Sequence, residues 1–186
     1  DSDGDFVVTW QSYVQDGSNF GVFAQRFTAA GSAQGTEFRV NVWTTSYQRN
    51  PSVAVDSDGD FVVTWQSNIQ DGSNEGVFAQ RFDAAGATQG SEFRVNTWTT
   101  DHQRYPSAAM DSDGDFVVAW VSFGQDGSGY GMFAQRFDAA GATQGSEFRV
   151  NTWTTSHQSR ASVAMDSDGD FVVTWESLGQ DGSYYG

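Results

Sequence analysis

Short apolar stretches alternate along the chain with segments rich in Asp, Gly and Ser, a pattern typical of β-strands joined by turns. In residues 61–66 apolar and polar positions alternate, so that Phe61, Val63 and Trp65 share one face. No stretch has the 3.6-residue period of an amphipathic helix. The pattern therefore predicts an all-β protein, with strands in one representative unit at residues 52–55, 61–66, 76–82 and 92–96.

The individual strands differ in polarity. The strand at 52–55 is the most apolar, which predicts the innermost place in its sheet. In the strand at 92–96 we expect Phe93 and Val95 to be buried, and Asn96 to face the solvent. The intervening segments DSDGD, QDGS and AAGATQG have the composition of turns.

This pattern is repeated in tandem every 55 residues, because DSDGDFVV(T/A)W begins at Asp1, Asp56, Asp111 and Asp166. Spacing this strict, without insertions, is typical of a repeat architecture. We expect one repeat array over residues 1–186, as a fragment of a longer chain. Its units are a partial unit at 1–50, full units at 51–105 and 106–160, and a partial unit at 161–186.

Four short strands per unit are typical of a β-propeller blade, and such a sheet must pack face to face with its neighbours to bury both of its faces. The chain holds three strands of one unit, four of each of the next two and two of the last, which predicts thirteen strands. That number is too small for a typical closed ring. A β-trefoil or prism-like threefold repeat is the alternative, whereas a solenoid is disfavoured because four strands per coil is too many.

The charge of the chain narrows its partners. It has 24 acidic residues against 9 Arg, with no Lys and no Cys, and a formal net charge of −15. This charge repels nucleic acid and anionic membrane surfaces, so we expect neither as a partner. No apolar run approaches the ~20 residues of a membrane span, so no membrane insertion is expected. The absence of Cys excludes disulfides and thiolate metal sites.

Half of the acidic residues lie in the DSDGD turns, where each turn places carboxylates at the first, third and fifth positions. Calcium prefers six to eight oxygen ligands, and alternate residues of a tight loop can direct several of them at one ion. An EF-hand is excluded because its glycine and glutamate positions hold Phe61 and Ser67. Turn chemistry alone is the other interpretation, since Asp and Gly favour tight turns. The candidate calcium ligands are Asp1, Asp3, Asp5, Asp56, Asp58, Asp60, Asp111, Asp113, Asp115, Asp166, Asp168 and Asp170.

A tryptophan follows the fourth strand in each N-x-W-T-T segment, at Trp43, Trp98 and Trp153. An exposed Trp beside Asn and Thr can stack on a sugar ring while the polar groups bind its hydroxyls. The alternative is that this side chain plugs the joint between successive blades. Both interpretations stay open at this point.

The sequence offers no recognisable catalytic arrangement. His102 and His157 occupy the place of Tyr47 in the first unit, which favours surface aromatics over bases or metal ligands. Departures from the repeat cluster after the Trp strand, for example where Asn19-Phe20 becomes Asn74-Glu75. Variable aromatic loops on a constant scaffold favour binding over catalysis.

The segments DSDGDFVVTW, GVFAQRFDAAG and EFRVNT together resemble tandem repeats of large secreted or cell-surface bacterial proteins, which often also carry calcium-binding adhesin-type repeats. The resemblance implies a secreted or cell-surface, propeller-like array. We therefore expect a non-catalytic module with an adhesive or structural role, stabilised by calcium. A lectin that binds glycans through the N-x-W-T-T loops is the alternative, and the scaffold of a larger polysaccharide-active enzyme is a third. Self-association through open sheet ends is also expected.

Overall fold

A computed structural model of the chain describes residues 1–182. Over these residues it contains thirteen β-strands and no helix, which confirms the all-β prediction and the predicted number of strands. It follows that no described residue belongs to a helix long and apolar enough to cross a membrane.

The strands form four antiparallel sheets, each built from consecutive strands. The first sheet has the order β1(Phe6–Tyr13), β2(Phe20–Phe27), β3(Ala33–Arg39). The second has the order β4(Gln48–Val55), β5(Phe61–Asn68), β6(Glu75–Phe82), β7(Thr88–Arg94). The third has the order β8(Gln103–Met110), β9(Phe116–Phe123), β10(Tyr130–Phe137), β11(Thr143–Arg149), and the last pairs β12(Gln158–Met165) with β13(Phe171–Ser177).

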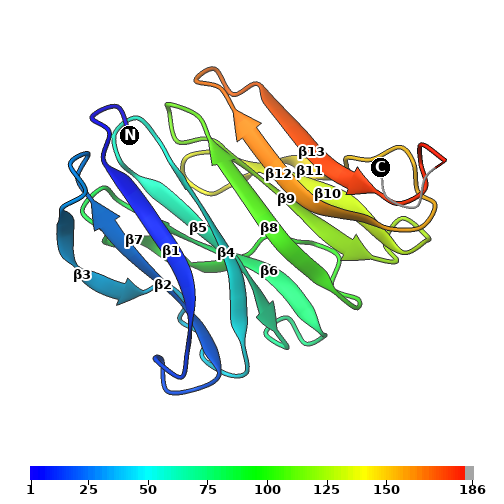
Figure 1. Ribbon diagram of the computed structural model, residues 1–186, viewed down its shortest axis with the longest axis horizontal. Helices are drawn as coiled ribbons and strands as arrows, with labels where there is room; N and C mark the ends of the chain where they lie inside the picture. Colours follow the sequence, from blue (N-terminus) through cyan, green and yellow to red (C-terminus); the bar gives the residue numbers. More distant parts are fainter. Residues whose placement is uncertain (183–186) are drawn as a thin grey trace.

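The sheets stand face to face in chain order, like neighbouring blades of a propeller that is not closed into a ring (Figure 1). The strands β4, β8 and β12 lie next to one another along the inner side of the stack. This confirms the prediction that the strand containing residues 52–55 is innermost. It also favours the propeller-like arrangement over the trefoil or prism alternative, and we call the sheets blades from here on.

The hydrophobic core lies between the blades rather than inside any of them. Trp65 and Phe61 of β5 are buried against Val22 and Ala24 of the preceding blade. One repeat later, Trp120 and its neighbours pack in the same way against the second blade. Because each blade covers the apolar face of the next, the repeat unit gains its stability from stacking.

The strand bounds of this unit differ from the sequence prediction, most of all in its first and fourth strands. The first strand of the unit, β4, begins at Gln48 rather than at Ser52. It contains an irregularity at Asn50, whose φ is 52°. The fourth strand of the unit, β7, is Thr88–Arg94 instead of 92–96, because the segment expected to be a turn already pairs with β6 from Thr88 onward.

The expected exposure of Asn96 is wrong. It is only 1% exposed, and its side-chain oxygen accepts the backbone N–H of Val77 at 2.7 Å. Val95 is buried as predicted.

Candidate functional site

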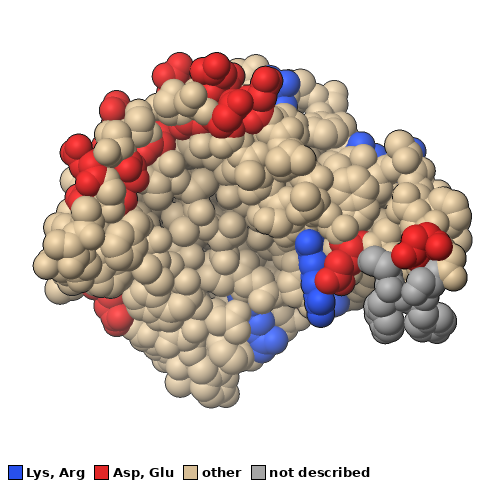
Figure 2. All heavy atoms as spheres, turned by 45° about the horizontal axis from the view of Figure 1, so that its top comes forward, with Lys and Arg blue, Asp and Glu red and all other residues tan. Residues whose placement is uncertain are grey.

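The four DSDGD turns lie together at one edge of the molecule, the edge at which the N terminus lies (Figure 1). Their serines link them: the Ser2 hydroxyl donates to the Ser57 carbonyl at 2.8 Å. Ser57 and Ser112 donate to the next turn in the same way. Figure 2 shows the band of acidic side chains that this arrangement produces. The stack of blades therefore gathers aspartates that are 55 residues apart in the sequence.

Within a turn, the first and third aspartates make hydrogen bonds that hold the fold. Oδ1 of Asp56 accepts the backbone N–H groups of Asp58 and Asp60, both at 2.9 Å. The Asp60 carboxylate accepts the N–H of Ala84 at 2.8 Å and the Gln89 amide at 3.2 Å, which ties the turn to the next hairpin. The pair of bonds made by the first aspartate recurs at Asp1, Asp111 and Asp166.

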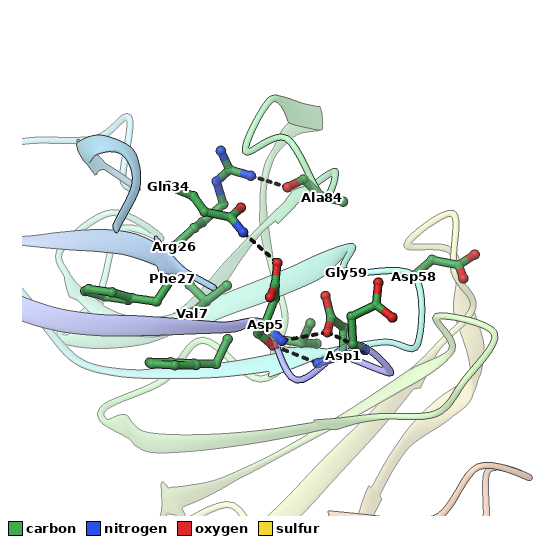
Figure 3. A pocket seen from close by; sticks show the side chains of 12 residues that line it. Asp1, Asp5, Val7, Arg26, Phe27, Gln34, Asp58, Gly59 and Ala84 are labelled. Carbon is green, nitrogen blue, oxygen red and sulfur yellow. Dashed lines mark hydrogen bonds between the residues drawn. The ribbon is translucent and has the colours of Figure 1, made fainter. Parts of the chain in front are cut away.

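The middle aspartate borders pockets between neighbouring turns. Asp58 lines a pocket of about 270 Å³ together with Asp1 and Asp5, and a second of about 160 Å³ with Asp113. Figure 3 shows the larger pocket, across which the Arg26 guanidinium donates to the carbonyl of Ala84. Among residues 1–182, no three His, Cys, Asp or Glu side chains are grouped closely enough to hold a metal ion. Calcium binding at these turns therefore stays a prediction.

Asp56 is a buried aspartate whose pKa is shifted. It is 9% exposed, and burial raises the pKa of its carboxyl above the ordinary value, with the nearby Asp60 charge adding to the effect. Hydrogen bonds from the backbone of the turn act in the opposite direction and do not cancel this rise. Ionised Asp56 is thus held at a cost to the fold.

The three N-x-W-T-T loops lie at the opposite end of the strands, between the outer strand of one blade and the inner strand of the next. Their tryptophans are similarly exposed, at 38% for Trp43, 40% for Trp98 and 39% for Trp153. The backbone of the loop contacts the following blade, since the N–H of Val42 donates to Glu92 at 2.7 Å. The loops therefore span the joints, while a large part of each indole stays accessible.

Two buried amides hold each loop in shape. Asn41 donates to the carbonyl of Trp43 at 2.8 Å, and Gln48 donates to the carbonyl of Thr45 at 3.1 Å. The indole N–H of Trp43 also donates to the Thr45 carbonyl, at 3.0 Å. The buried amides of the other two loops are Asn96, Gln103, Asn151 and Gln158. Each tryptophan is consequently presented from a loop that buried side-chain amides hold in place.

Within residues 1–182, one cluster at this end occurs in a single copy. The Glu75 carboxylate accepts the Tyr47 hydroxyl at 2.7 Å and the Arg104 guanidinium at 3.0 Å, and it also hydrogen-bonds to Nδ1 of His102. The Glu75 side chain is 4% exposed, and its pKa is lowered because these hydrogen bonds and the charge of Arg104 outweigh the desolvation that would raise it.

The sequence interpretation missed this cluster. It treated His102 as a surface aromatic, whereas the structure places its ring against a buried carboxylate. A signal was present, because Glu75 stands where the neighbouring units have Phe20 and Tyr130. A charged residue at a position that is otherwise aromatic indicates a local change of partners.

Comparison with known proteins shows the fold and no closer relationship. No protein-family model matches the sequence, and no curated protein matches it. The chain superposes on an endo-arabinase from Bacteroides thetaiotaomicron with a TM-score of 0.58 at 14% identity, covering 100% of this chain and 70% of that one.

Two further solved structures share the arrangement. A protein of unknown function from Dyadobacter fermentans matches with a TM-score of 0.66 at 12% identity, over 95% of this chain and 47% of that one. A sucrose-6-phosphate hydrolase from Lactobacillus gasseri matches with a TM-score of 0.57 at 8% identity, over 95% of this chain and 40% of that one. The chain therefore spans less than half the length of these two proteins.

Proposed function

We propose that this chain is a non-catalytic carbohydrate-binding module, which binds a polysaccharide through Trp43, Trp98 and Trp153. The observation that carries this proposal is the repetition of one exposed indole, at 38–40% exposure, on three loops that buried Asn and Gln side chains hold in place. An aromatic ring is a platform for the apolar face of a sugar, and a pre-ordered loop loses little entropy on binding.

The repetition favours a polymer over a single sugar. Three equivalent weak sites on one rigid stack gain affinity when they engage the same chain, because the second and third contacts form within one complex. This multivalent mode suits an adhesive role on a secreted or cell-surface protein, as the sequence resemblance implies. The carbohydrate enzymes among the proteins of similar fold, an endo-arabinase and a sucrose-6-phosphate hydrolase, support the choice of a sugar ligand.

Calcium is the proposed stabiliser of the opposite edge. Asp58 and Asp113 line a pocket between neighbouring turns. A divalent cation bound there would reduce the repulsion between the aspartate carboxylates of the DSDGD turns. This second proposal is independent of the first, because the turns and the tryptophan loops lie at opposite ends of the strands.

Binding to a panel of soluble plant and bacterial polysaccharides by affinity electrophoresis tests the carbohydrate proposal. We expect retardation by at least one polymer, a loss of about tenfold in affinity for Trp98→Ala, and no binding when all three tryptophans are replaced. Val42→Ala is the control, since it removes an exposed side chain beside Trp43 and leaves all three indoles in place. Unchanged retardation of the triple variant would refute the proposal.

A further inference from the structure

Glu75 connects two of the three tryptophan loops. Tyr47, which donates its hydroxyl to Glu75, ends the loop that carries Trp43. His102, which hydrogen-bonds to the same carboxylate, ends the loop that carries Trp98. A single buried side chain at the start of β6 therefore joins segments that are 55 residues apart.

At the first and third joints an aromatic residue, Phe20 or Tyr130, stands at the position that Glu75 occupies at the second. At the first joint, the Arg49 guanidinium lies 4.3 Å from the ring centres of both Phe20 and Tyr47. At the third joint, the rings of Tyr130 and His157 are 5.3 Å apart, and the backbone N–H of Tyr130 donates to His157. These contacts are aromatic, so the Trp153 loop does not depend on the charge of a buried acid.

The groups around Glu75 come from several elements besides its own. Tyr47 belongs to the loop before β4, His102 to the loop before β8, and Arg104 to β8 itself. Tyr130 of β10 lies behind Arg104 and accepts its guanidinium at 3.3 Å. On the neighbouring strand β5, the paired residue is the uncharged Asn68, whose backbone N–H donates to the Tyr47 carbonyl. The negative charge of Glu75 is thus the centre to which both loops are attached.

We propose that Glu75 is an acid-sensitive clamp of the glycan-binding face. The ionised carboxylate holds the Trp43 and Trp98 loops as one unit, and uptake of a proton releases both while leaving the Trp153 loop in place. The proposal rests on the function assigned above and adds its regulation: two of three sites would be weakened in acid. Glu75 is a positioning residue, since it acts on the ligand only through the two loops.

Hydrogen exchange of the loop segments 41–48, 96–103 and 151–158, measured by mass spectrometry without any polysaccharide, tests the clamp directly. We expect Glu75→Gln at neutral pH to raise exchange about tenfold in the first two segments and to leave the third unchanged. The unmodified chain should show the same selective increase as the pH falls well below the ordinary carboxyl value of 4.5, after correction for intrinsic rates, whereas Glu75→Gln should show no further step. Equal rates in both proteins, or a parallel rise in all three segments, would overturn the proposal.

Two milder variants keep the test open if Glu75→Gln does not fold. Tyr47→Phe removes one hydroxyl and should loosen only segment 41–48, while His102→Gln should loosen only segment 96–103. Selective loosening in each case supports the clamp, and loosening in neither contradicts it. Failure of the carbohydrate proposal would be seen separately, as an absence of polysaccharide binding by the unmodified chain at neutral pH.

Discussion

The side-chain oxygen of Asn96 lies 2.7 Å from the backbone nitrogen of Val77 and accepts its hydrogen bond inside the protein, where both groups are almost fully buried. Asn41 and Asn151 make the same bond to Val22 and Met132. The asparagine of each N-x-W-T-T segment thus accepts a hydrogen bond from a backbone N–H of β2, β6 or β10. The same asparagine also fixes the tryptophan loop.

Asn96→Ala is predicted to destabilise the protein by about 1–3 kcal/mol, since it leaves the buried N–H of Val77 without an acceptor. Chemical denaturation at neutral pH measures the change. Asn74→Ala, at an exposed position, serves as the control and is expected to stay within about 0.5 kcal/mol of the unmodified protein. Equal stability of the two variants would contradict the role assigned to Asn96.

Much of the fold was predictable because the repeat displays its own pattern. Alternation over residues 61–66 predicts the buried face of Trp65, and the copy number predicts thirteen strands. Asn96 could not be assigned in this way, because the alternation rule places it on a solvent face once the strand is assumed to continue. The strand ends at Arg94, after which the chain turns inward and the rule no longer applies.

The contacts of the Glu75 cluster could not be predicted, for a different reason, although a charged residue at an otherwise aromatic position marked the place. Its members belong to two blades and meet only through face-to-face packing, so no local spacing indicates their contact. The aspartate turns are the reverse case. Their positions were evident, but the hydrogen bonds of Asp56 and Asp60 appear only when the neighbouring hairpin is in place.

Two ion pairs of the chain are predicted to differ widely in their contribution to stability. In the pair of Arg104 with Glu75 the side chains are 25% and 4% exposed, whereas in that of Arg160 with Glu176 they are 79% and 51% exposed. Arg104→Met should cost about 2–3 kcal/mol, less than for a fully buried pair, because Tyr47 and His102 still bind the carboxylate.

Arg160→Met is the matched control and should cost less than about 0.5 kcal/mol. The two variants are compared by urea denaturation at one ionic strength. A cost for Arg160→Met as large as that for Arg104→Met would show that burial does not govern these pairs.

The stabilising effect of the Glu75 charge should depend on pH. Since the folded-state pKa is below the ordinary value of 4.5, the stabilisation is fully present above that value and is lost as the pH falls through the lowered pKa. The stability difference between the unmodified chain and Glu75→Gln should therefore be constant near neutrality and shrink below about pH 4.5. A difference that is independent of pH across this range would contradict the assignment.

Asp56→Asn is predicted to stabilise the protein at neutral pH in the presence of chelator. The folded-state pKa of Asp56 lies above its ordinary value of 3.8, so the fold becomes less favourable as the pH rises from that value through the raised pKa. The amide keeps an oxygen to accept the turn N–H groups and removes the charge. A higher melting temperature at pH 7, with no gain below about pH 3.8, is the expected result. Asp166→Asn, in the exposed fourth turn, is the control and should show a smaller gain.

Excess calcium is predicted to reverse the stabilising effect of Asp56→Asn. If the turns bind the ion, excess calcium raises the melting temperature of the unmodified chain, and saturation at 100 times the dissociation constant adds about 2.7 kcal/mol for each site. Asp56→Asn and Asp58→Asn should reduce this gain, because each removes a charged oxygen from the second turn. Thermal unfolding with calcium and with chelator makes the comparison, and identical melting temperatures would refute calcium binding.

The chain is also predicted to self-associate. Within the described residues, β1 and β13 each have a neighbour on one side only, so each leaves an unpaired row of backbone groups. Val8 on β1 and Val172 on β13 are 43% and 59% exposed, which adds apolar surface to these edges. Unpaired apolar edges are templates for pairing with another copy, and a charge placed on such a strand opposes it. Light scattering should show a mass that rises with concentration, and Val172→Lys should lower it. A monomer at every concentration would contradict this prediction, whereas an unchanged mass for Val172→Lys would exclude β13 as the contact.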